Sequence, residues 1–270
     1  MVGSAAAATQ FHALHAGPDL LILPNAWDAA SARLMQEVGA KAVATSSAAV
    51  AWSHGFADGH HLPIARLVAT VEEIARVISA PLSVDAEGGY SDDPALVGEN
   101  VSALVNAGAV GINLEDGREP HELHLRKVEA AREAGERAGV ALFINARVDV
   151  YLKKLAAPEA AAAEVIRRGL ACKEAGASGL FAAGVSKIED IEAIAAGVAL
   201  ALNVLAWPGL PKAAELKRLG VRRLSAGNFV FDSAASAARA AAQTFLRDGE
   251  SGALAASGAG LPNWNALFRG

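Results

Sequence analysis

The sequence predicts a single (β/α)8 barrel of the TIM type, and two patterns along its 270 residues support this fold class. Eight short apolar runs are each followed by a stretch with helical periodicity, and strands that alternate with helices form parallel sheets through right-handed crossovers. Most of these runs are apolar on both faces in their first half, as expected when helices cover a sheet. An open doubly wound sheet is the alternative fold, but it usually has fewer strands.

The eight predicted strands start 21 to 40 residues apart. They occupy residues 20–25, 42–47, 82–87, 111–116, 142–147, 179–184, 201–206 and 222–227. The helices between them commonly end at a glycine that precedes the next strand. The clearest is the helix within 93–109, which has Asp93 as its cap and Pro94 at its first position. We expect one domain over 1–270, with a flexible start at 1–10 and a C-terminal tail at 248–270.

The composition excludes several classes of function. The net charge is −5 and no basic run is present, which disfavours nucleic acid and acidic membrane surfaces as partners. The single cysteine, Cys172, rules out a disulfide framework, so we expect a reducing, cytoplasmic location. The N-terminus does not read as a signal peptide. The longest apolar run, residues 193–207, is shorter than the ~20 residues of a membrane span.

Polar side chains gather at the carboxyl ends of the predicted strands, where parallel barrels hold their reactive residues. Asp85 and Glu87 end the third strand, Glu115 the fourth and Arg147 the fifth. Three converging carboxylates raise one another's pKa, and one arginine does not balance them. A divalent ion with oxygen ligands does, and Mg²⁺ suits the site because it needs only one or two direct carboxylates. We therefore predict Mg²⁺ as the cofactor, with Mn²⁺ as the alternative ion, near the backbone of Gly88.

Six segments of the sequence resemble the isocitrate lyase/phosphoenolpyruvate mutase superfamily, in order and spacing, from about residue 11 to about residue 245. These segments are LPNAWDAASARL, TSSAAVAWSHGFADG, VDAEGGY, GINLEDG, INARVDVY and RRLSAG. The resemblance implies a single barrel, a magnesium ion and a small 2-oxo or 2-hydroxy acid as ligand. It also implies cleavage or formation of C–C or P–C bonds through a pyruvate-like enolate.

The resemblance also implies roles for individual residues. Asp85 matches the acid that holds the metal directly or through water, and Glu115 matches the acid that completes the metal shell. Glu87 stands where the family usually has an aspartate, which is a departure. Arg147 matches the arginine that clamps substrate oxygens. The substrate-binding set is Trp27, Thr45, Ser46, Ser47, Gly88, Arg147 and Asn203, and the catalytic set is Arg147, Asp58, Glu115 and His121.

The departures from the family indicate which reaction to expect. The loop after the fourth strand lacks the cysteine that serves as proton donor in the isocitrate lyases, and Cys172 falls in a predicted helix as a core residue. The loop also lacks the asparagine of the mutases. The remaining site favours decarboxylation of an oxaloacetate-like acid, or a retro-aldol lyase with His121, Glu122 or Tyr90 moving the proton.

Two other functions stay open. One is a mutase or hydrolase that acts on a phosphonate, and the other is a barrel that binds a carboxylate without turning it over. The resemblance further implies a homodimer or homotetramer in which the last helix, residues 228–246, packs against a neighbour and is exchanged between subunits.

Overall fold

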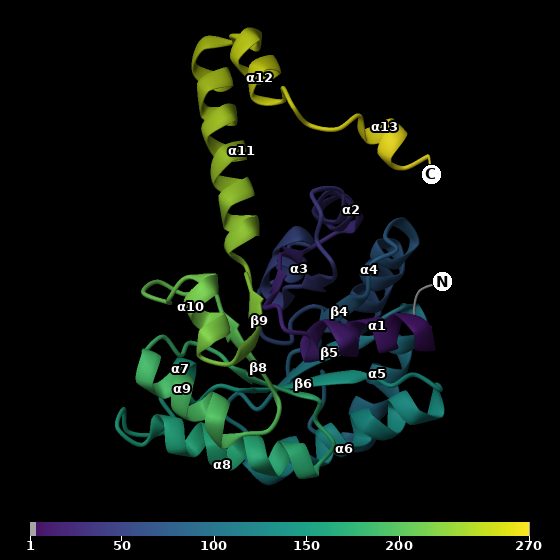
Figure 1. The fold of residues 1–270 in the computed structure, drawn as a ribbon. Helices are drawn as coiled ribbons and strands as arrows, with labels where there is room; N and C mark the ends of the chain where they lie inside the picture. The colour runs from purple at the N-terminus through teal and green to yellow at the C-terminus, as the bar shows by residue number, and fades with distance from the viewer. Residues whose placement is uncertain (1–3, 270) are drawn as a thin grey trace.

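The computed structural model describes residues 4–269 and places nine parallel strands in one sheet (Figure 1). Along the sheet the strand order is β1-β9-β8-β7-β6-β5-β4-β3-β2. The strands are β1 (Leu21–Leu23), β2 (Asn25–Ala26), β3 (Val43–Thr45), β4 (Leu82–Asp85), β5 (Gly111–Glu115), β6 (Phe143–Val148), β7 (Gly179–Ala182), β8 (Ala201–Leu205) and β9 (Val221–Ser225). This order is that of a barrel.

The strands β1 and β2 are two pieces of the first predicted strand. Pro24 separates them, and proline has no N–H group with which to continue a ladder. The first piece pairs with β9, and the second pairs with β3. The sheet therefore closes through this interrupted strand, and the eight-stranded barrel predicted from the sequence is confirmed.

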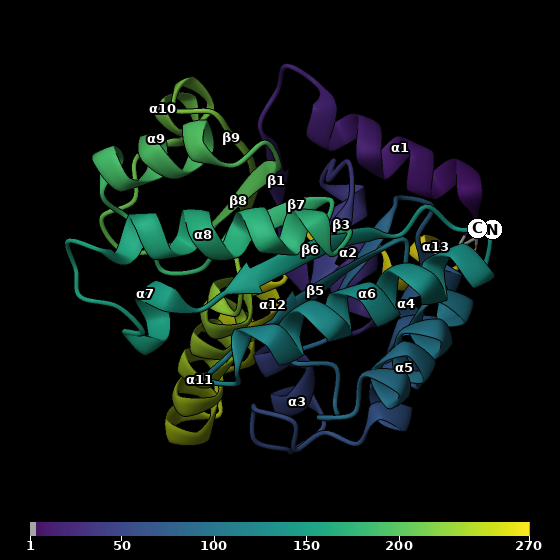
Figure 2. The same cartoon turned by 90° about the horizontal axis from the view of Figure 1, so that it is seen from below.

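Helices alternate with the strands and cover the outside of the barrel, as α5, α6 and α8 do in Figure 2. The helices are α1 (Ala5–Ala16), α2 (Ala29–Glu37), α3 (Ser47–Ser53), α4 (Ile64–Val77), α5 (Pro94–Ala107), α6 (His121–Arg137), α7 (Val150–Lys153), α8 (Ala161–Glu174), α9 (Ile188–Gly197), α10 (Ala213–Arg218), α11 (Phe229–Asp248), α12 (Ser251–Ser257) and α13 (Trp264–Leu267). Helix α5 starts as predicted, because Asp93 Oδ1 accepts a hydrogen bond from the Ala95 N–H (3.0 Å). Within the described residues, no helix is both long and apolar enough to cross a membrane.

The apolar core lies between the strands and the surrounding helices, whereas the inside of the barrel is polar. Arg223 on β9 is fully buried, and its guanidinium donates to Ser83 Oγ on β4 and to Asn113 Oδ1 on β5, each at 3.4 Å. These bonds cross the barrel, so the three side chains point inward. The sequence indicated apolar first halves for these strands, but the apolar residues alternate with inward polar residues.

Helix α1 covers the amino end of the barrel. Phe11 is completely buried, and its ring lies 5.4 Å from that of Phe143 at the start of β6. Within the segment 1–10, for which a flexible start is expected, the chain is helical from Ala5 onward and Ala8 is buried; residues 1–3 lie outside the described part of the chain. Burial of its apolar face stabilises this helix, which the pattern of polar and apolar residues in the sequence does not predict.

Helix α11 projects away from the barrel, and the tail folds back from its far end (Figure 1). No residue of α11 is buried, although it carries large apolar side chains such as Leu246, which is 84% exposed. At the end of the tail, the Leu267 carbonyl accepts a hydrogen bond from Arg33 Nε on α2 (3.1 Å). The tail thus contacts the barrel, while α11 keeps a free apolar face.

Candidate active site

Asp85 ends β4 and is 8% exposed at the carboxyl end of the barrel. Its backbone N–H donates to Thr45 Oγ1 (2.9 Å), and its Oδ2 accepts from the Ser47 N–H (3.2 Å). These two bonds fix the orientation of the carboxylate. The other oxygen, Oδ1, is buried without a hydrogen-bond partner among the described residues. An ionised, buried oxygen of this kind is costly unless a cation or donor meets it.

Glu87 lies in a turn after β4 rather than on the strand. Its φ is +47°, and the Gly89 N–H donates to the Ala86 carbonyl (2.8 Å) to close this turn. The predicted strand over 82–87 is therefore two residues too long, because the glycines after Glu87 favour a turn. The carboxylate accepts bonds from the His60 N–H and from the Tyr90 hydroxyl (3.0 Å). Burial, together with nearby Asp85, raises the pKa of Glu87 to about 7.

Glu115 and Arg147 are register partners on β5 and β6, and their side chains form an ion pair of 2.7 Å. The guanidinium also holds Asp149 with two bonds, from Nε (2.7 Å) and from Nη2 (3.1 Å). Burial raises the pKa of Glu115, and the positive charge of Arg147 lowers it. The carboxylates of Asp149, Asp85 and Glu87 raise this pKa further. The structure thus brings the predicted acids of β4 and β5 together with Arg147, and it adds Asp149, which the sequence reasoning did not assign.

Unpartnered polar atoms continue from Asp85 down the inside of the barrel. Besides Asp85 Oδ1, the atoms without hydrogen-bond partners within residues 4–269 include Asn145 Oδ1, Asn203 Nδ2 and Arg223 Nε. Burial lowers the pKa of Arg223 to about 10, and Asp85 partly opposes this. Asn203, predicted to line the substrate pocket, is fully buried and accepts a bond from Ser225 Oγ (3.3 Å). It is therefore a buried residue of the barrel, in register through Phe181 with Arg147.

The predicted carboxylate-binding segment lies beside Asp85. The Ser46 hydroxyl caps α3 by accepting from the Ala49 N–H (3.4 Å). The backbone N–H of Ser46 donates to the Ala26 carbonyl (3.2 Å), and that of Ser47 donates to Asp85. Both amides are therefore engaged with protein acceptors in this structure. Thr45 supports the Asp85 backbone rather than facing outward.

The remaining predicted residues surround this centre at different depths. The Trp27 ring packs edge-on against Phe231 of α11, with 5.2 Å between ring centroids. Asp58 is exposed in the loop that leads to His60, and it acts electrostatically on Glu87. Gly88 donates its N–H to His60 Nε2 (2.9 Å), and a Cβ at this position would approach that ring to 3.0 Å. A side chain at position 88 would therefore require the His60 ring to move by a few tenths of an ångström.

Lys127 of α6 is a further site-supporting residue that sequence reasoning missed. It is 1% exposed and donates to the Gly88 carbonyl (3.0 Å) and to Glu119 (2.5 Å). Its ammonium therefore holds the turn after β4 from beneath. The sequence does contain a signal for its burial, because Lys127 lies three residues after His124 and therefore on the buried face of α6.

His121 lies apart from the carboxylates at the barrel mouth. The charged groups that act on it most strongly are His124, Arg168 and Asp116, and burial lowers its pKa to about 4. Cys172 is fully buried in α8, so its prediction as a core residue is confirmed. Both residues lie between β5, α6 and α8.

The residues at the mouth fit a divalent oxygen-liganded ion. Asp85 offers an oriented, buried oxygen that has no hydrogen-bond partner among the described residues, which is the observation that such an ion would explain. Both Glu87 oxygens already accept hydrogen bonds, and Glu115 is paired with Arg147. Mg²⁺ retains several waters, so these two acids suit contact through water.

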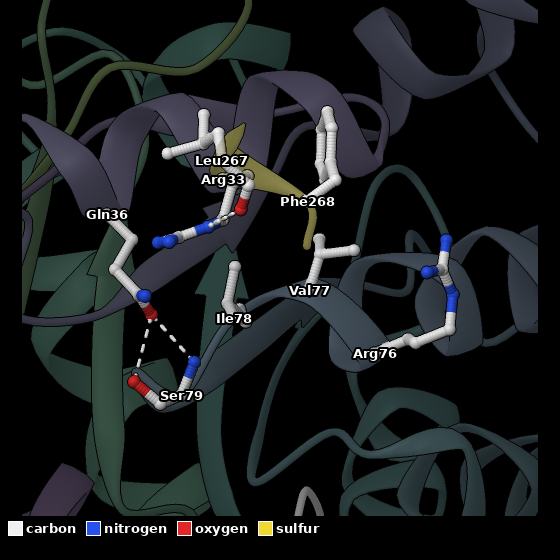
Figure 3. A pocket seen from close by; sticks show the side chains of 8 residues that line it. All are labelled: Arg33, Gln36, Arg76, Val77, Ile78, Ser79, Leu267 and Phe268. Carbon is white, nitrogen blue, oxygen red and sulfur yellow. Dashed lines mark hydrogen bonds between the residues drawn. The ribbon is translucent and has the colours of Figure 1, made fainter. Parts of the chain in front are cut away.

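Cavities of the molecule also lie at the amino ends of the strands, away from this centre. One of about 360 Å³ is lined by residues of α2, the α4–β4 connection and α13, including Arg33 and Phe268 (Figure 3). Its wall is fixed by Gln36, whose Oε1 accepts from the Ser79 N–H (2.7 Å). Barrels place catalytic residues at the opposite end, so we do not locate the active site here.

Comparison with known proteins identifies the family. Residues 11–246 match the phosphoenolpyruvate phosphomutase family, and the chain therefore belongs to it. A protein of Mycobacterium tuberculosis without an assigned activity is 33% identical over 240 residues, covering 89% of this chain and 90% of that protein. Oxaloacetate decarboxylase of Pseudomonas fluorescens is 29% identical over 233 residues, covering 84% of this chain and 80% of the enzyme.

A solved structure is also similar. It is a phosphonomutase candidate from Burkholderia cenocepacia J2315, with 37% identity and a TM-score of 0.84, covering 87% of this chain and 98% of that one. The family resemblance read from the sequence is thereby confirmed. Because the relatives include lyases and mutases, the chain belongs to a family of enzymes.

Proposed function

We propose that this protein is a Mg²⁺-dependent lyase that decarboxylates a small 2-oxo dicarboxylic acid of the oxaloacetate type through an enolate. The observation that carries the proposal is the Asp85 carboxylate, which is oriented by Ser47 next to Glu87, Glu115 and Arg147. One of its buried oxygens has no partner within the described part of the chain. The likeness to oxaloacetate decarboxylase over most of the chain supports the same substrate class.

Asp85 would hold the ion, with Glu87 and Glu115 holding its waters. When bound, a divalent ion supplies an electrophile that stabilises negative charge on a substrate oxygen. Arg147 has three of its five donors engaged with Glu115 and Asp149, so the others are available to orient a substrate carboxylate. The two acids keep the guanidinium in place, which limits the reorganisation needed when substrate binds.

The described loop after β5 carries no carboxyl that is free to donate a proton to substrate, which fits decarboxylation, because Asp116 is held by Arg168 and by the Asp149 N–H. This loop, residues 116–120, is short, and its Glu119 is engaged with Lys127. Cys172 cannot serve, since it is buried within α8. Loss of CO₂ leaves an enolate that water can protonate, whereas a retro-aldol cleavage also needs a base for the substrate hydroxyl. Tyr90 and Glu87 are the nearest such pair.

The direct test measures pyruvate release from oxaloacetate by the purified protein, with Mg²⁺ and after chelation. We expect turnover above the rate caused by Mg²⁺ alone, its loss on chelation, and a fall of about 10²–10³-fold in kcat/KM for Asp85→Asn. Asp19→Asn, which changes an exposed aspartate before β1, is the matched control and should keep full activity. Chelation without effect would overturn the proposal.

The phosphonate alternative is tested on the same preparation. The 37% identity to a phosphonomutase candidate is the observation that favours it. Turnover of phosphonopyruvate with no turnover of oxaloacetate would replace our proposal with that function. If neither acid is consumed but oxalate raises the melting temperature in the presence of Mg²⁺, the barrel binds a carboxylate without catalysis.

A further inference from the structure

A buried group of nitrogen, oxygen and sulfur atoms lies outside the barrel, between β5, α6 and α8. We call it the α6–α8 cluster; its core is Asp116, His121 and His124, and Cys172 stands beside His124, outside the distance that the other three share. His121 and His124 are three residues apart and share one face of α6. One ligand atom from each histidine and one Asp116 oxygen all lie within 4.8 Å of one another. Cys172 Sγ lies 3.7 Å from His124 Nδ1.

The contacts of His124 orient its ring as a ligand. Its Nε2 lies 3.1 Å from the Leu114 carbonyl oxygen, which can only accept a hydrogen bond. The proton therefore sits on Nε2, and Nδ1 directs its lone pair at Cys172. Metal-bound histidines commonly donate their second N–H to a carbonyl in this way, which fixes the tautomer.

His121 is the member that a simple core hydrogen bond does not explain. A thiol-to-imidazole bond between Cys172 and His124 would satisfy those two residues. The His121 ring is only 7% exposed, and both of its nitrogens lack a hydrogen-bond partner among residues 4–269. Leaving such groups buried and unsatisfied costs about 1–3 kcal/mol each. A bound ion would satisfy the ring.

We propose that the α6–α8 cluster binds one transition-metal ion, with Zn²⁺ as the preferred occupant, which ties α6 and α8 to the end of β5. Mixed imidazole, thiolate and carboxylate ligands in tetrahedral geometry select zinc, whereas Mg²⁺ prefers oxygen alone. A thiolate and an imidazole on one tetrahedral zinc are separated by ~3.6 Å, given the usual Zn–S and Zn–N lengths. The distance between Cys172 and His124 matches this, and Cys172 has to move toward Asp116 and His121 to complete the tetrahedron.

The charges around the cluster are balanced. Binding transfers the Cys172 thiol proton to solvent, so a thiolate and the Asp116 carboxylate neutralise Zn²⁺. Arg168 donates to Asp116 Oδ2 (2.6 Å), and Glu164 balances this arginine through a 2.7 Å ion pair. The Asp149 N–H occupies one lone pair of Asp116 Oδ1 (2.9 Å). Each carboxylate oxygen has two acceptor sites, so Asp116 can still ligate.

The test is a Co²⁺ titration of the full-length, chelator-treated protein, followed by absorption spectroscopy. We expect one tightly bound Co²⁺ with visible d–d bands of tetrahedral intensity and a thiolate-to-cobalt charge-transfer band, both removed by Zn²⁺ and distinct from the weak bands of any Co²⁺ that Asp85 holds through oxygen ligands. Cys172→Ser should lose the charge-transfer band. His121→Gln, at the first residue of α6, should weaken the affinity by at least the roughly 10–100-fold that loss of an outer-shell partner causes.

Two controls separate this cluster from the barrel mouth. His61→Ala removes an exposed histidine elsewhere and should retain the spectrum. Asp85→Asn should also retain it, so this inference can fail or hold independently of the proposed decarboxylase activity. The proposal is overturned if the wild type shows no thiolate band, if the band survives in Cys172→Ser, or if it disappears in Asp85→Asn. Should Cys172→Ser not fold, the His121→Gln affinity decides.

Discussion

The contact between Lys127 and the turn after β4 allows a quantitative prediction. The Lys127→Met substitution keeps the length of the side chain and removes its ammonium. Two acceptors lose their donor at once: the Gly88 carbonyl and the Glu119 carboxylate. Because Lys127 is only 1% exposed, water cannot replace the ammonium readily. Breaking a buried charge pair by removing one partner destabilises a protein by about 3–5 kcal/mol.

The expected loss is measurable as a change in unfolding. For a chain of this size, 1 kcal/mol shifts the melting temperature by about 2–4 °C, so Lys127→Met should melt about 6–20 °C lower. Lys173→Met, which changes an exposed lysine of α8, is the matched control and should shift it little. Differential scanning calorimetry and urea unfolding provide the two measurements.

A second substitution tests the reason for the loss. In Lys127→Met/Glu119→Gln the stranded carboxylate is neutral, so part of the stability should return. If Lys127→Met lowers the free energy of unfolding by less than about 1 kcal/mol, the ion pair does not stabilise this turn. The same conclusion follows if Glu119→Gln, added to Lys127→Met, lowers that free energy again by a similar amount.

Three further predictions concern the site and the assembly. Without metal, the free energy of unfolding should fall as pH rises from about 4.5 to about 7, because the folded state disfavours the charged form of Glu87. In urea unfolding, Glu87→Gln should remove up to about 3 kcal/mol of this pH dependence, and an unchanged pH profile in the variant would contradict the prediction. Arg147→Lys should lower kcat/KM for oxaloacetate by about 10²–10³-fold, because a lysine cannot hold Glu115 and Asp149 in a fork; wild-type kinetics would exclude the clamp. The wild type should be a dimer or tetramer by light scattering, and a monomeric wild type would refute this. Leu246→Glu should dissociate the oligomer, because the α11 interface would then bury a charge.

The fold followed from the sequence because each strand is a short apolar run with a glycine or proline signal beside it. Pro24 was visible in the sequence, but only the closed sheet shows that it splits the first strand between two neighbours. Helix α1 was not predicted, since its stability depends on Phe11 packing across the amino end of the barrel. Such packing joins residues that are distant in the chain.

The site was predictable in part, for a physical reason. Glu115 and Arg147 end adjacent strands, so parallel register alone brings them together. Glu87 was misplaced on the strand because the turn depends on contacts with His60 and Tyr90. Arg223 could not be assigned to the barrel interior from the Arg-Arg pair in the sequence, because arginine side chains are mostly exposed in proteins and this one is buried. Its hydrogen-bond partners, Ser83 and Asn113, come from two other strands.

The central claim is that Asp85 holds a divalent ion beside Glu87 and Glu115. Crystals soaked with Mn²⁺ and oxalate test it most directly, because anomalous scattering locates manganese without reference to activity. We expect an anomalous peak within bonding distance of Asp85 Oδ1, with oxalate between the ion and Arg147. Ordered oxalate with no manganese at Asp85, or manganese bound elsewhere in the chain only, would contradict it.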